Sequence, residues 1–410
     1  MRSGDRASPP LQFPQVRGIA PLACFCFKHP IQLKPNDFVP VLRACCRGYF
    51  NLCLLIQVSL TNAAWHAVAR ANRALGSLDM ASRQVPNPGL IRMPMIRREA
   101  QSTSALEGTY APLDRVLAVD DSSDVPKSAE LNEIMNYVRV ADKAFEWLQD
   151  GRRITPGLMT GLHRILVKGT AADTGDAGSV RSLQVVIGSR GADITSARFI
   201  PQPPGHELEA ALRDLLDWIN EPPPDGRDPV ISAAMAHYQF ETIHPFDDGN
   251  GRLGRLLIVL GLMKDGVISE PLLSVSPWFE ARRDIYQDQL ALLSETGNWS
   301  AWIEFFAEGI AASAQETASL VDDLLDVNQR HMEALRIAQS TGVILDIAGS
   351  LLANPIVTKA RLARKFNKSY QTVSNAVAKL LQLGILEEYP YKATQNTYIA
   401  SDIFGILTRK

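Results

Sequence analysis

The chain of 410 residues is long enough for two or three domains, and its 46% hydrophobic content is that of an ordinary globular protein. A formal net charge of −2 excludes a strongly basic or acidic protein, so any contact with nucleic acid or membrane must rest on a local patch. The best candidate for a membrane span, YFNLCLLIQVSL from Tyr49, is shorter than the roughly 18 residues that a span needs. We find no targeting signal and predict a cytoplasmic protein with no membrane partner.

The first 60 residues differ in composition from the rest. They are rich in proline, and they hold all five cysteines: Cys24, Cys26, Cys45, Cys46 and Cys53. The cysteines show no paired CxxC spacing, which favours reduced thiols over a zinc site. We predict that residues 1–60 are an extension of uncertain order.

Residues 61–320 form the first predicted domain, and their pattern is mainly helical. Apolar residues recur at helical spacing in NAAWHAVARANRALGSL, PMIRREAQSTSALEG and SAELNEIMNYVRVADKAFEWLQDG. Two further helices begin with an N-cap followed by proline, at Thr155–Pro156 and at Asp228–Pro229. The exception is RSLQVVIGSRGADITSARFI, whose β-branched runs around Gly188 and Gly191 predict a β-hairpin.

A helical connector is predicted for residues 321–353, and the composition changes after it. In residues 354–410, TKARLARKFNKSYQTVSNAVAKLLQ predicts two helices joined by a tight turn, and GILEEY and NTYIAS predict a pair of strands. This order is typical of a winged helix-turn-helix. We therefore expect a mainly α fold with a small β-hairpin and a C-terminal winged helix-turn-helix.

The segment ETIHPFDDGNGRLGRLLIV, from Glu241 to Val259, concentrates the residues of a candidate site. It joins two predicted helices, residues 229–243 and a second helix that begins near Gly251. The second helix is apolar on nearly all sides after Arg255, so we expect it to be central and buried. A loop mounted on such a helix is a rigid support for chemistry.

The residue types in this loop indicate a bound polyphosphate. Gly249, Asn250 and Gly251 expose backbone N–H groups at a helix N-terminus, where an anion is favoured. Arg252 and Arg255 share one face of the first turn, and a di- or triphosphate would offset their unfavourable position there.

Two more residues add chemistry to the predicted phosphate site. Asp248 is an oxygen ligand suited to Mg²⁺ beside the phosphates, and His244 can take a proton from a hydroxyl near neutral pH. Each residue alone has a structural explanation, such as a buried histidine, a turn or a helix cap. Their combination favours the transfer of a phosphorus-centred group.

The motif HPFDDGNGRLGR resembles the signature of the Fic domain family, HPFx[DE]GNGRxxR, at every fixed position from His244 to Arg255. The resemblance extends over roughly residues 65–315 through LHRILVKG, GSVRSLQVVIG, ARFIPQPP, AHYQFETIHPF and GNWSAWIEFFAEGI. It implies a Fic-type helical bundle that transfers AMP from ATP to a Tyr, Thr or Ser hydroxyl of a protein and releases pyrophosphate. By this resemblance His244 is the base and Asp248 holds Mg²⁺. The implied phosphate-binding residues are Gly249, Asn250, Gly251, Arg252 and Arg255.

The predicted hairpin resembles the flap of the family, which clamps the target segment by strand addition and borders the nucleotide. This resemblance implies nucleotide contacts from Ile187, Gly188 and Ser189. Tyr286 is a candidate for the adenine pocket, with core packing as the alternative.

A second motif lies upstream. Gly108 predicts the end of a helix, which puts Glu107 in the last turn, where a carboxylate needs a cation. A solvated surface glutamate is the alternative. The segment TSALEG, from Thr103 to Gly108, matches the inhibitory motif of the family, [ST]xxxE[GN]. The resemblance implies that Glu107 pairs with Arg255 and restrains AMP transfer.

The C-terminal module has a local basic bias, because residues 356–386 contain lysine and arginine but no acidic residue. The expected phosphate contacts are Lys359, Arg361, Arg364, Lys365, Lys368 and Lys379. The expected base contacts are Ser369, Tyr370, Gln371, Thr372 and Asn375. Winged helices also bind proteins or form dimers, so DNA, a protein and a homodimer all stay open as partners.

Two other functions also stay open. A DNA-binding regulator would use the Fic portion to sense nucleotide without turnover, and an enzyme that removes AMP from its targets would use Glu107 to position water. The intact His244 favours AMP transfer over sensing, because sensing alone needs no base.

Overall fold

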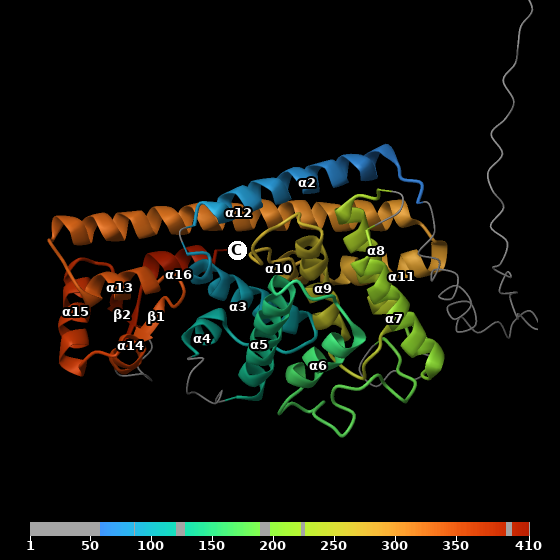
Figure 1. Cartoon of the computed structure of the whole chain (residues 1–410), viewed down its shortest axis with the longest axis horizontal. Coiled ribbons are helices and arrows are strands. Elements are labelled where there is room, and N and C mark those ends of the chain that lie inside the picture. The colour runs from blue at the N-terminus through green and yellow to red at the C-terminus, as the bar shows by residue number, and fades with distance from the viewer. Residues whose placement is uncertain are drawn as a thin grey trace, which may run out of the picture. The chain divides into compact units, whose positions relative to one another are not determined.

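The computed structural model describes residues 58–85, 87–119, 128–188, 197–222, 226–390 and 396–409. These residues are mainly helical and include one small antiparallel sheet (Figure 1). The elements are, in chain order, α2 (Asn62–Arg83), α3 (Gly89–Leu106), α4 (Leu113–Ala118), α5 (Ala129–Gln149), α6 (Pro156–Leu166), α7 (His206–Asn220), α8 (Pro229–Ile243), α9 (Asn250–Lys264), α10 (Ser276–Glu280), α11 (Arg283–Thr296), α12 (Trp299–Ile337), α13 (Val343–Ser350), β1 (Ile356–Thr358), α14 (Lys359–Phe366), α15 (Tyr370–Gln382), β2 (Glu387–Glu388), β3 (Thr397–Ile399) and α16 (Ser401–Leu407). The five cysteines lie outside the described residues.

The predicted helix starts at the two proline caps are confirmed. The Thr155 hydroxyl accepts a hydrogen bond from the Leu158 N–H at 3.1 Å, and α6 begins at the next residue. The Asp228 carboxylate accepts one from the Val230 N–H at 2.8 Å, and α8 begins at Pro229. The end of α8 at Ile243 is also the predicted one, so the loop that follows begins at His244.

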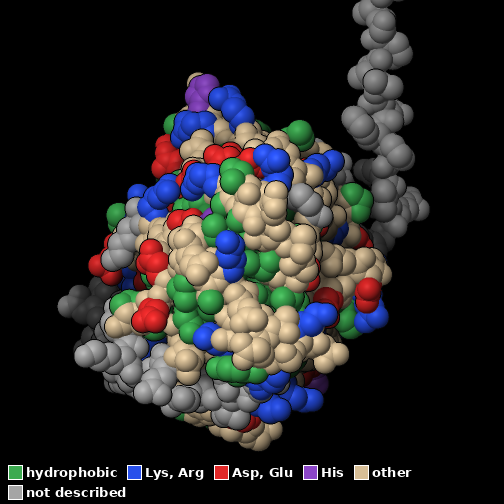
Figure 2. Space-filling model, turned by 90° about the vertical axis from the view of Figure 1, so that its left-hand side faces the viewer, with side chains coloured by type: hydrophobic (Ala, Val, Ile, Leu, Met, Phe, Trp, Pro, Cys, Tyr) green, Lys and Arg blue, Asp and Glu red, His purple; other side chains and the backbone are tan. Residues whose placement is uncertain are grey.

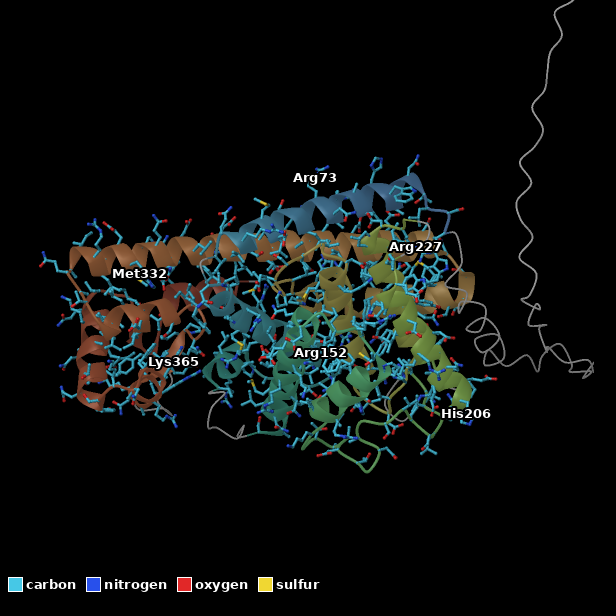
Figure 3. The ribbon with its side chains drawn as sticks, viewed as in Figure 1. Arg73, Arg152, His206, Arg227, Met332 and Lys365 are labelled. Carbon is cyan, nitrogen blue, oxygen red and sulfur yellow. The ribbon has the colours of Figure 1, made fainter. Side chains whose placement is uncertain are left out.

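Helix α9 is buried in the middle of the helical layer, as its apolar sequence predicts. Its residues from Leu253 to Leu260 are all buried, and it packs against α3, α5 and α8. Side chains fill the space between these helices (Figure 3). The N-terminal turn of α9 is therefore held on several sides, which gives the loop before it a firm support.

Helix α12 is the longest described element, with 39 residues and a length of about 58 Å. Helix α2 packs along it (Figure 1), and the Trp302 indole N–H donates to the Ala234 carbonyl of α8 at 2.9 Å. The predicted connector, residues 321–353, comprises the second part of α12 together with α13. Among the described residues, no helix combines the length and the apolarity needed to cross a bilayer.

The C-terminal residues form two helices, α14 and α15, followed by strands β2 and β3, as predicted. The sheet has the order β1-β3-β2 and is antiparallel throughout. Strand β1 was not predicted, because three residues are too few to show a period of two. The Tyr389 hydroxyl, directly after β2, donates to the Asp114 carboxylate of α4 at 2.7 Å, which joins this segment to the helices around α3.

Candidate active site

A cavity of about 490 Å³ lies where the ends of α3, α8 and α9 meet α11. It falls within the usual size of small-molecule sites, roughly 300–1,000 Å³. Seven of the predicted site residues line it: Glu107, Ile187, Gly188, His244, Gly251, Arg255 and Tyr286. Asp248, Gly249, Asn250 and Arg252 belong to the adjoining loop and the first turn of α9. Ser189 lies outside the described residues.

His244 follows the last residue of α8 and adopts a left-handed conformation, with φ of 49°. Its Nδ1 lies 3.3 Å from the Glu241 carbonyl oxygen, which can only accept, so Nδ1 carries the proton and Nε2 has a free lone pair for another proton. Burial lowers the pKa of His244 to about 4. The imidazole is therefore neutral at pH 7 and is available as a base.

The loop between His244 and α9 is closed by Asn250. Its side-chain oxygen accepts a hydrogen bond from the Phe246 N–H at 2.9 Å, and its amide donates to the Phe246 carbonyl at 2.7 Å. Gly249 has a φ of 80°, which strains any residue with a Cβ, and a Cβ there would lie 2.8 Å from a methyl carbon of Leu166. The sequence predicts Asn250 as a phosphate ligand, but its side chain shapes the loop, which leaves its backbone N–H at the helix N-terminus.

His163 of α6 contacts this loop at Phe246 and at the Asp248 carbonyl. The sequence analysis did not identify this residue. Its ring stacks on Phe246 at 4.2 Å between centroids. The Gly178 N–H donates to Nδ1 at 3.0 Å, so Nε2 carries the proton and donates to the Asp248 carbonyl at 3.1 Å. Burial lowers the pKa of His163 to about 4, which keeps this arrangement neutral. The one available signal was a histidine on the apolar face of an amphipathic helix.

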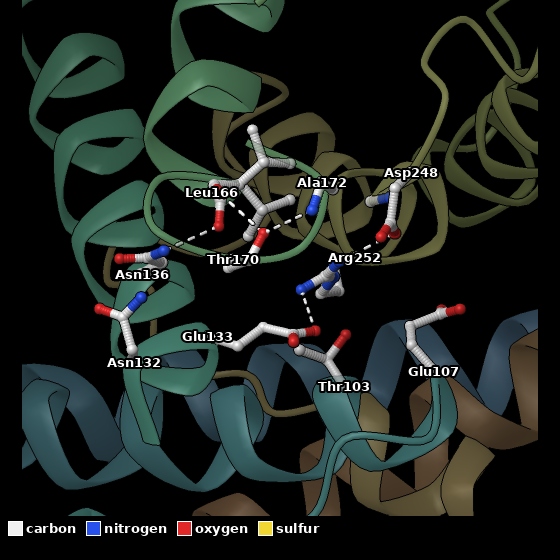
Figure 4. A network of polar contacts seen from close by, with 12 residues as sticks. Thr103, Glu107, Asn132, Glu133, Asn136, Leu166, Thr170, Ala172, Asp248 and Arg252 are labelled. Carbon is white, nitrogen blue, oxygen red and sulfur yellow. Dashed lines mark hydrogen bonds and ion pairs between the residues drawn. The ribbon is translucent and has the colours of Figure 1, made fainter. Parts of the chain in front are cut away.

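The two arginines of the motif are both buried and paired. Arg252 donates to the Glu133 carboxylate at 2.6 Å and to the Asp248 carboxylate at 3.0 Å (Figure 4). Arg255 donates to Glu107 at 2.5 Å. The sequence analysis expected a bound anion to offset these cations at a helix N-terminus. In this structure three carboxylates of the chain itself supply the negative charge.

Glu107 lies directly over the first turn of α9. A Cβ added to Gly251 would be 2.1 Å from the Glu107 Oε1, so the carboxylate needs the bare glycine beneath it. Thr103, one turn earlier in α3, accepts from the Arg255 Nε through its hydroxyl at 2.8 Å and from Nη2 through its carbonyl at 3.1 Å. Burial raises the pKa of Glu107, but the charge and the hydrogen bond of Arg255, together with the charges of Arg252 and His244, lower it by more, so the net pKa is lowered and the carboxylate is ionised at pH 7.

Comparison of the sequence with models of known protein families finds two matches that include most of these site residues. The model of the Fic/DOC family N-terminal region matches residues 65–146, and the model of the Fic/DOC family matches residues 153–262. Residues 65–146 and 153–262 therefore carry Fic/DOC family domains. The resemblance noted from the motif is thereby confirmed.

Curated relatives of this Fic protein are named protein adenylyltransferases. The proteins called fic-1 from Caenorhabditis briggsae and Caenorhabditis elegans are each 33% identical over 170 residues, which is 40% of this chain and 31% of theirs. The chain thus matches about a third of the length of these relatives. A solved Fic family protein from Desulfovibrio desulfuricans G20 has a TM-score of 0.54 and 23% identity, with 84% of this chain and 97% of that chain covered. This likeness supports the fold.

The predicted hairpin is described only at its base. Ile187 and Phe199 form an antiparallel bridge, with N–H to carbonyl distances of 2.9 and 3.0 Å. The remainder of the predicted hairpin lies outside the described residues. Tyr286 borders the cavity but its hydroxyl lies 2.7 Å from Nε2 of the buried His237, so it combines cavity lining with core packing.

Arg181 donates hydrogen bonds both to the backbone at the ends of the predicted hairpin and to the backbone of His244. It is almost fully buried, and it donates to the carbonyls of His244 at 2.8 Å, of Leu183 at 3.0 Å and of Gln202. Its own N–H donates to the Pro245 carbonyl at 2.9 Å. The sequence analysis missed this residue, because the partners of its side chain lie up to 63 positions away.

We expect Arg181→Met to lower the free energy of unfolding by about 3 kcal/mol, because three carbonyl groups lose their buried donor. Urea denaturation monitored by circular dichroism measures the change. Arg213→Met on the exposed side of α7 is the matched control and should shift the value by less than about 0.5 kcal/mol. Equal stabilities of the two variants would contradict the role given to Arg181.

Proposed function

We propose that this Fic protein transfers AMP from ATP to the hydroxyl of a Tyr, Thr or Ser side chain in a protein target. The observation that carries the proposal is a neutral imidazole, His244, in the same cavity as Arg255 and the N-terminal turn of α9. The names of the curated relatives support the same reaction. We also propose the cytoplasm as its compartment, because that is where ATP is abundant.

In the proposed reaction the target hydroxyl attacks the α-phosphorus of ATP. A new oxygen–phosphorus bond forms, the bond to the β-phosphate oxygen breaks, and pyrophosphate leaves. The hydroxyl proton passes to Nε2 of His244. The backbone N–H groups of Asn250, Gly251 and Arg252 at the start of α9 would stabilise the phosphates, together with the guanidinium groups of Arg252 and Arg255.

Mg²⁺ fits this site as an ion shared with the nucleotide. Among the described residues, no group of three or more His, Cys, Asp or Glu side chains could hold a metal. Mg²⁺ at nucleotide sites needs only one or two carboxylates, because phosphate oxygens and water complete its shell. Asp248, whose side chain is 53% exposed beside the α9 N-terminus, would be that carboxylate. The ion would neutralise phosphate charge during the transfer.

Glu107 would restrain this reaction by holding Arg255. Its carboxylate accepts a hydrogen bond from Nη2 of Arg255 and covers Gly251, where a phosphate would bind the helix N-terminus. A triphosphate could bind productively only after Glu107 has moved away. The proposal is therefore an enzyme with a low basal rate.

The direct test is mass spectrometry of the full chain and of candidate target proteins after incubation with MgATP. A mass gain of one AMP on a hydroxyl side chain is expected, and it should be absent with an ATP analogue whose α–β bridge is not cleaved. If no protein in a cell lysate and no residue of the chain gains AMP, the proposed transfer is wrong.

We further propose that the C-terminal segment is a winged helix-turn-helix that contacts DNA. Gln371 and Asn375 are exposed and lie one turn apart on α15, and side-chain amides of this kind pair with adenine in the major groove. Figure 2 shows this end of the molecule, where Lys and Arg side chains are scattered among acidic, hydrophobic and uncharged groups. We therefore expect weak binding that depends strongly on salt.

For this second proposal, Lys368→Ala should weaken binding to a DNA duplex severalfold for all sequences. It should also lower the slope of log K against log salt by about one, since one phosphate contact is lost. Fluorescence anisotropy over a salt series measures both values, with Lys143→Ala on the exposed side of α5 as the control. Absence of any duplex binding at low salt would contradict DNA contact.

A further inference from the structure

Two carboxyl groups lie over two glycines of α9. Gly251 and Gly254 are three residues apart, so they share one face of the helix. A Cβ on Gly251 would meet the Glu107 Oε1 at 2.1 Å, and a Cβ on Gly254 would meet the Glu241 Oε1 at 2.5 Å. Because these two positions have no side chain, one carboxyl group can lie against each of them. Glu107 is paired with Arg255, whereas no hydrogen bond to the Glu241 Oε1 is found among the described residues.

Glu241 borders the cavity, and its Oε1 is buried with no hydrogen-bond partner among the residues that the structure describes. Burial raises its pKa to about 7; the Arg255 charge lowers it and the Glu107 charge raises it. Glu99 differs from Glu241 in its hydrogen bonding. It is also a buried acidic residue, but its carboxyl oxygens accept three hydrogen bonds, from the Ser274 hydroxyl and from the N–H and hydroxyl of Ser276. An unsatisfied carboxyl group in a cavity wall is costly unless a ligand completes it.

The charged and titratable groups that line the cavity with Glu241 come from every side of it, and they include Arg198 and Arg283. Arg255 contributes a cation from α9, Glu107 an anion from the end of α3, and Tyr286 a phenol from α11. His244, directly after the end of α8, lines the same cavity. When a phosphate replaces Glu107 at Arg255, the charge of another anion acts on Glu241 in its place. An ionised Glu241 would then repel the ligand, whereas a protonated one could donate to it.

We propose that Glu241 is a nucleotide-binding residue that acts in its protonated form and donates its O–H to a phosphate held at Arg255. This inference rests on the proposed function, because it requires a polyphosphate in the cavity. Binding above neutral pH must then be accompanied by uptake of one proton by Glu241. The affinity falls as the pH rises, since the protonated form becomes scarce.

The test compares two variants of the full chain, Glu107→Gly and Glu107→Gly/Glu241→Gln, for binding of a MgATP analogue and of inorganic tripolyphosphate between pH 6 and pH 9. Glutamine is neutral at every pH and can donate an N–H, so both variants should bind alike at pH 6. Above pH 7 the affinity of the Glu107→Gly variant should fall about tenfold per pH unit relative to that of the Glu107→Gly/Glu241→Gln variant.

The titration of the ligand itself is common to both proteins and cancels in the ratio of their affinities. Glu107→Gly/Glu241→Ala, which has no donor, should bind more weakly than the glutamine variant at every pH. A constant ratio of affinities from pH 6 to pH 9 would overturn the proposal. So would the absence of tripolyphosphate and nucleotide binding at pH 6.

Thermal unfolding gives a readout that needs no ligand. The pKa of Glu241 is higher in the folded protein than in the unfolded chain, so its favourable contribution is present at low pH and is lost as the pH rises through about 7. Glu241→Gln should therefore raise Tm at pH 8 but not at pH 5. Asp284→Asn on the exposed side of α11 is the control and should change Tm equally at both values.

These outcomes separate the two proposals. If nucleotide binds with the expected pH dependence but no AMP is transferred, the proposed function is wrong and the role of Glu241 stands. If AMP is transferred and the affinity ratio does not change with pH, the role of Glu241 is wrong and the proposed function stands.

Discussion

Glu107→Gly is expected to raise AMP incorporation into the protein itself about 10- to 100-fold, the effect of removing a charge-assisted hydrogen bond worth roughly 1.5–3 kcal/mol. The change frees Nη2 of Arg255 and uncovers Gly251, so a triphosphate can reach both. The backbone at Glu107 has φ of −91° and ψ of 2°, which glycine adopts without strain. Labelled ATP with Mg²⁺ measures the incorporation.

Asp150 provides a matched control for this substitution. Like Glu107 it ends a helix and precedes a glycine with positive φ, but its carboxylate pairs with the exposed Arg152, away from the cavity lining. Asp150→Gly should leave incorporation unchanged. Equal rates for the parent and the Glu107→Gly protein would contradict restraint by Glu107. Loss of AMP from a pre-modified chain that depends on Glu107 would instead favour AMP removal.

His244→Ala, made in the Glu107→Gly protein, should lower the rate of AMP transfer by about 10²- to 10⁴-fold, because the target hydroxyl loses its base. Nucleotide binding should be retained, since the phosphate contacts come from α9. Single-turnover transfer and equilibrium binding distinguish the two steps. His206→Ala, at a fully exposed position on α7, is the control.

The pH dependence of the rate offers a second check on His244. Its pKa is lowered, so the basic form is present at all pH values above about 4 and is lost only as the pH falls through that value. At saturating nucleotide the rate should therefore not fall between pH 8 and pH 6. A loss of rate centred near the ordinary histidine pKa of about 6.5 would show that the imidazole is more solvated than the structure indicates.

The central loop of the site could be predicted from the sequence because its residues are contiguous. Helix α8 was bounded by its Asp228 cap and the motif itself, and α9 was identified by its apolar run. The turn chemistry of Gly249 and Gly251 is also local. Where local pattern determines structure, sequence reasoning is sufficient.

The supports of the loop could not be predicted, because each depends on a contact between distant segments. Glu133 meets Arg252 across 119 positions, and His163 meets the Asp248 carbonyl across 85. Glu241 lies inside the motif, yet only the packing of α8 on α9 shows that its carboxyl group lies over Gly254. The partner of Glu107 came from resemblance and not from any periodicity.

The contacts of Arg255 determine how little must move when its partner changes. Two hydrogen bonds of Arg255 go to Thr103, through the hydroxyl and the carbonyl, and another goes to Glu107. A guanidinium fixed by the C-terminal end of α3 keeps its direction after one acceptor has left, and the negative end of that helix favours the cation. When a phosphate takes the place of the Glu107 carboxylate, only one acceptor at Nη2 of Arg255 changes. The guanidinium group is already oriented, so little reorganisation is needed.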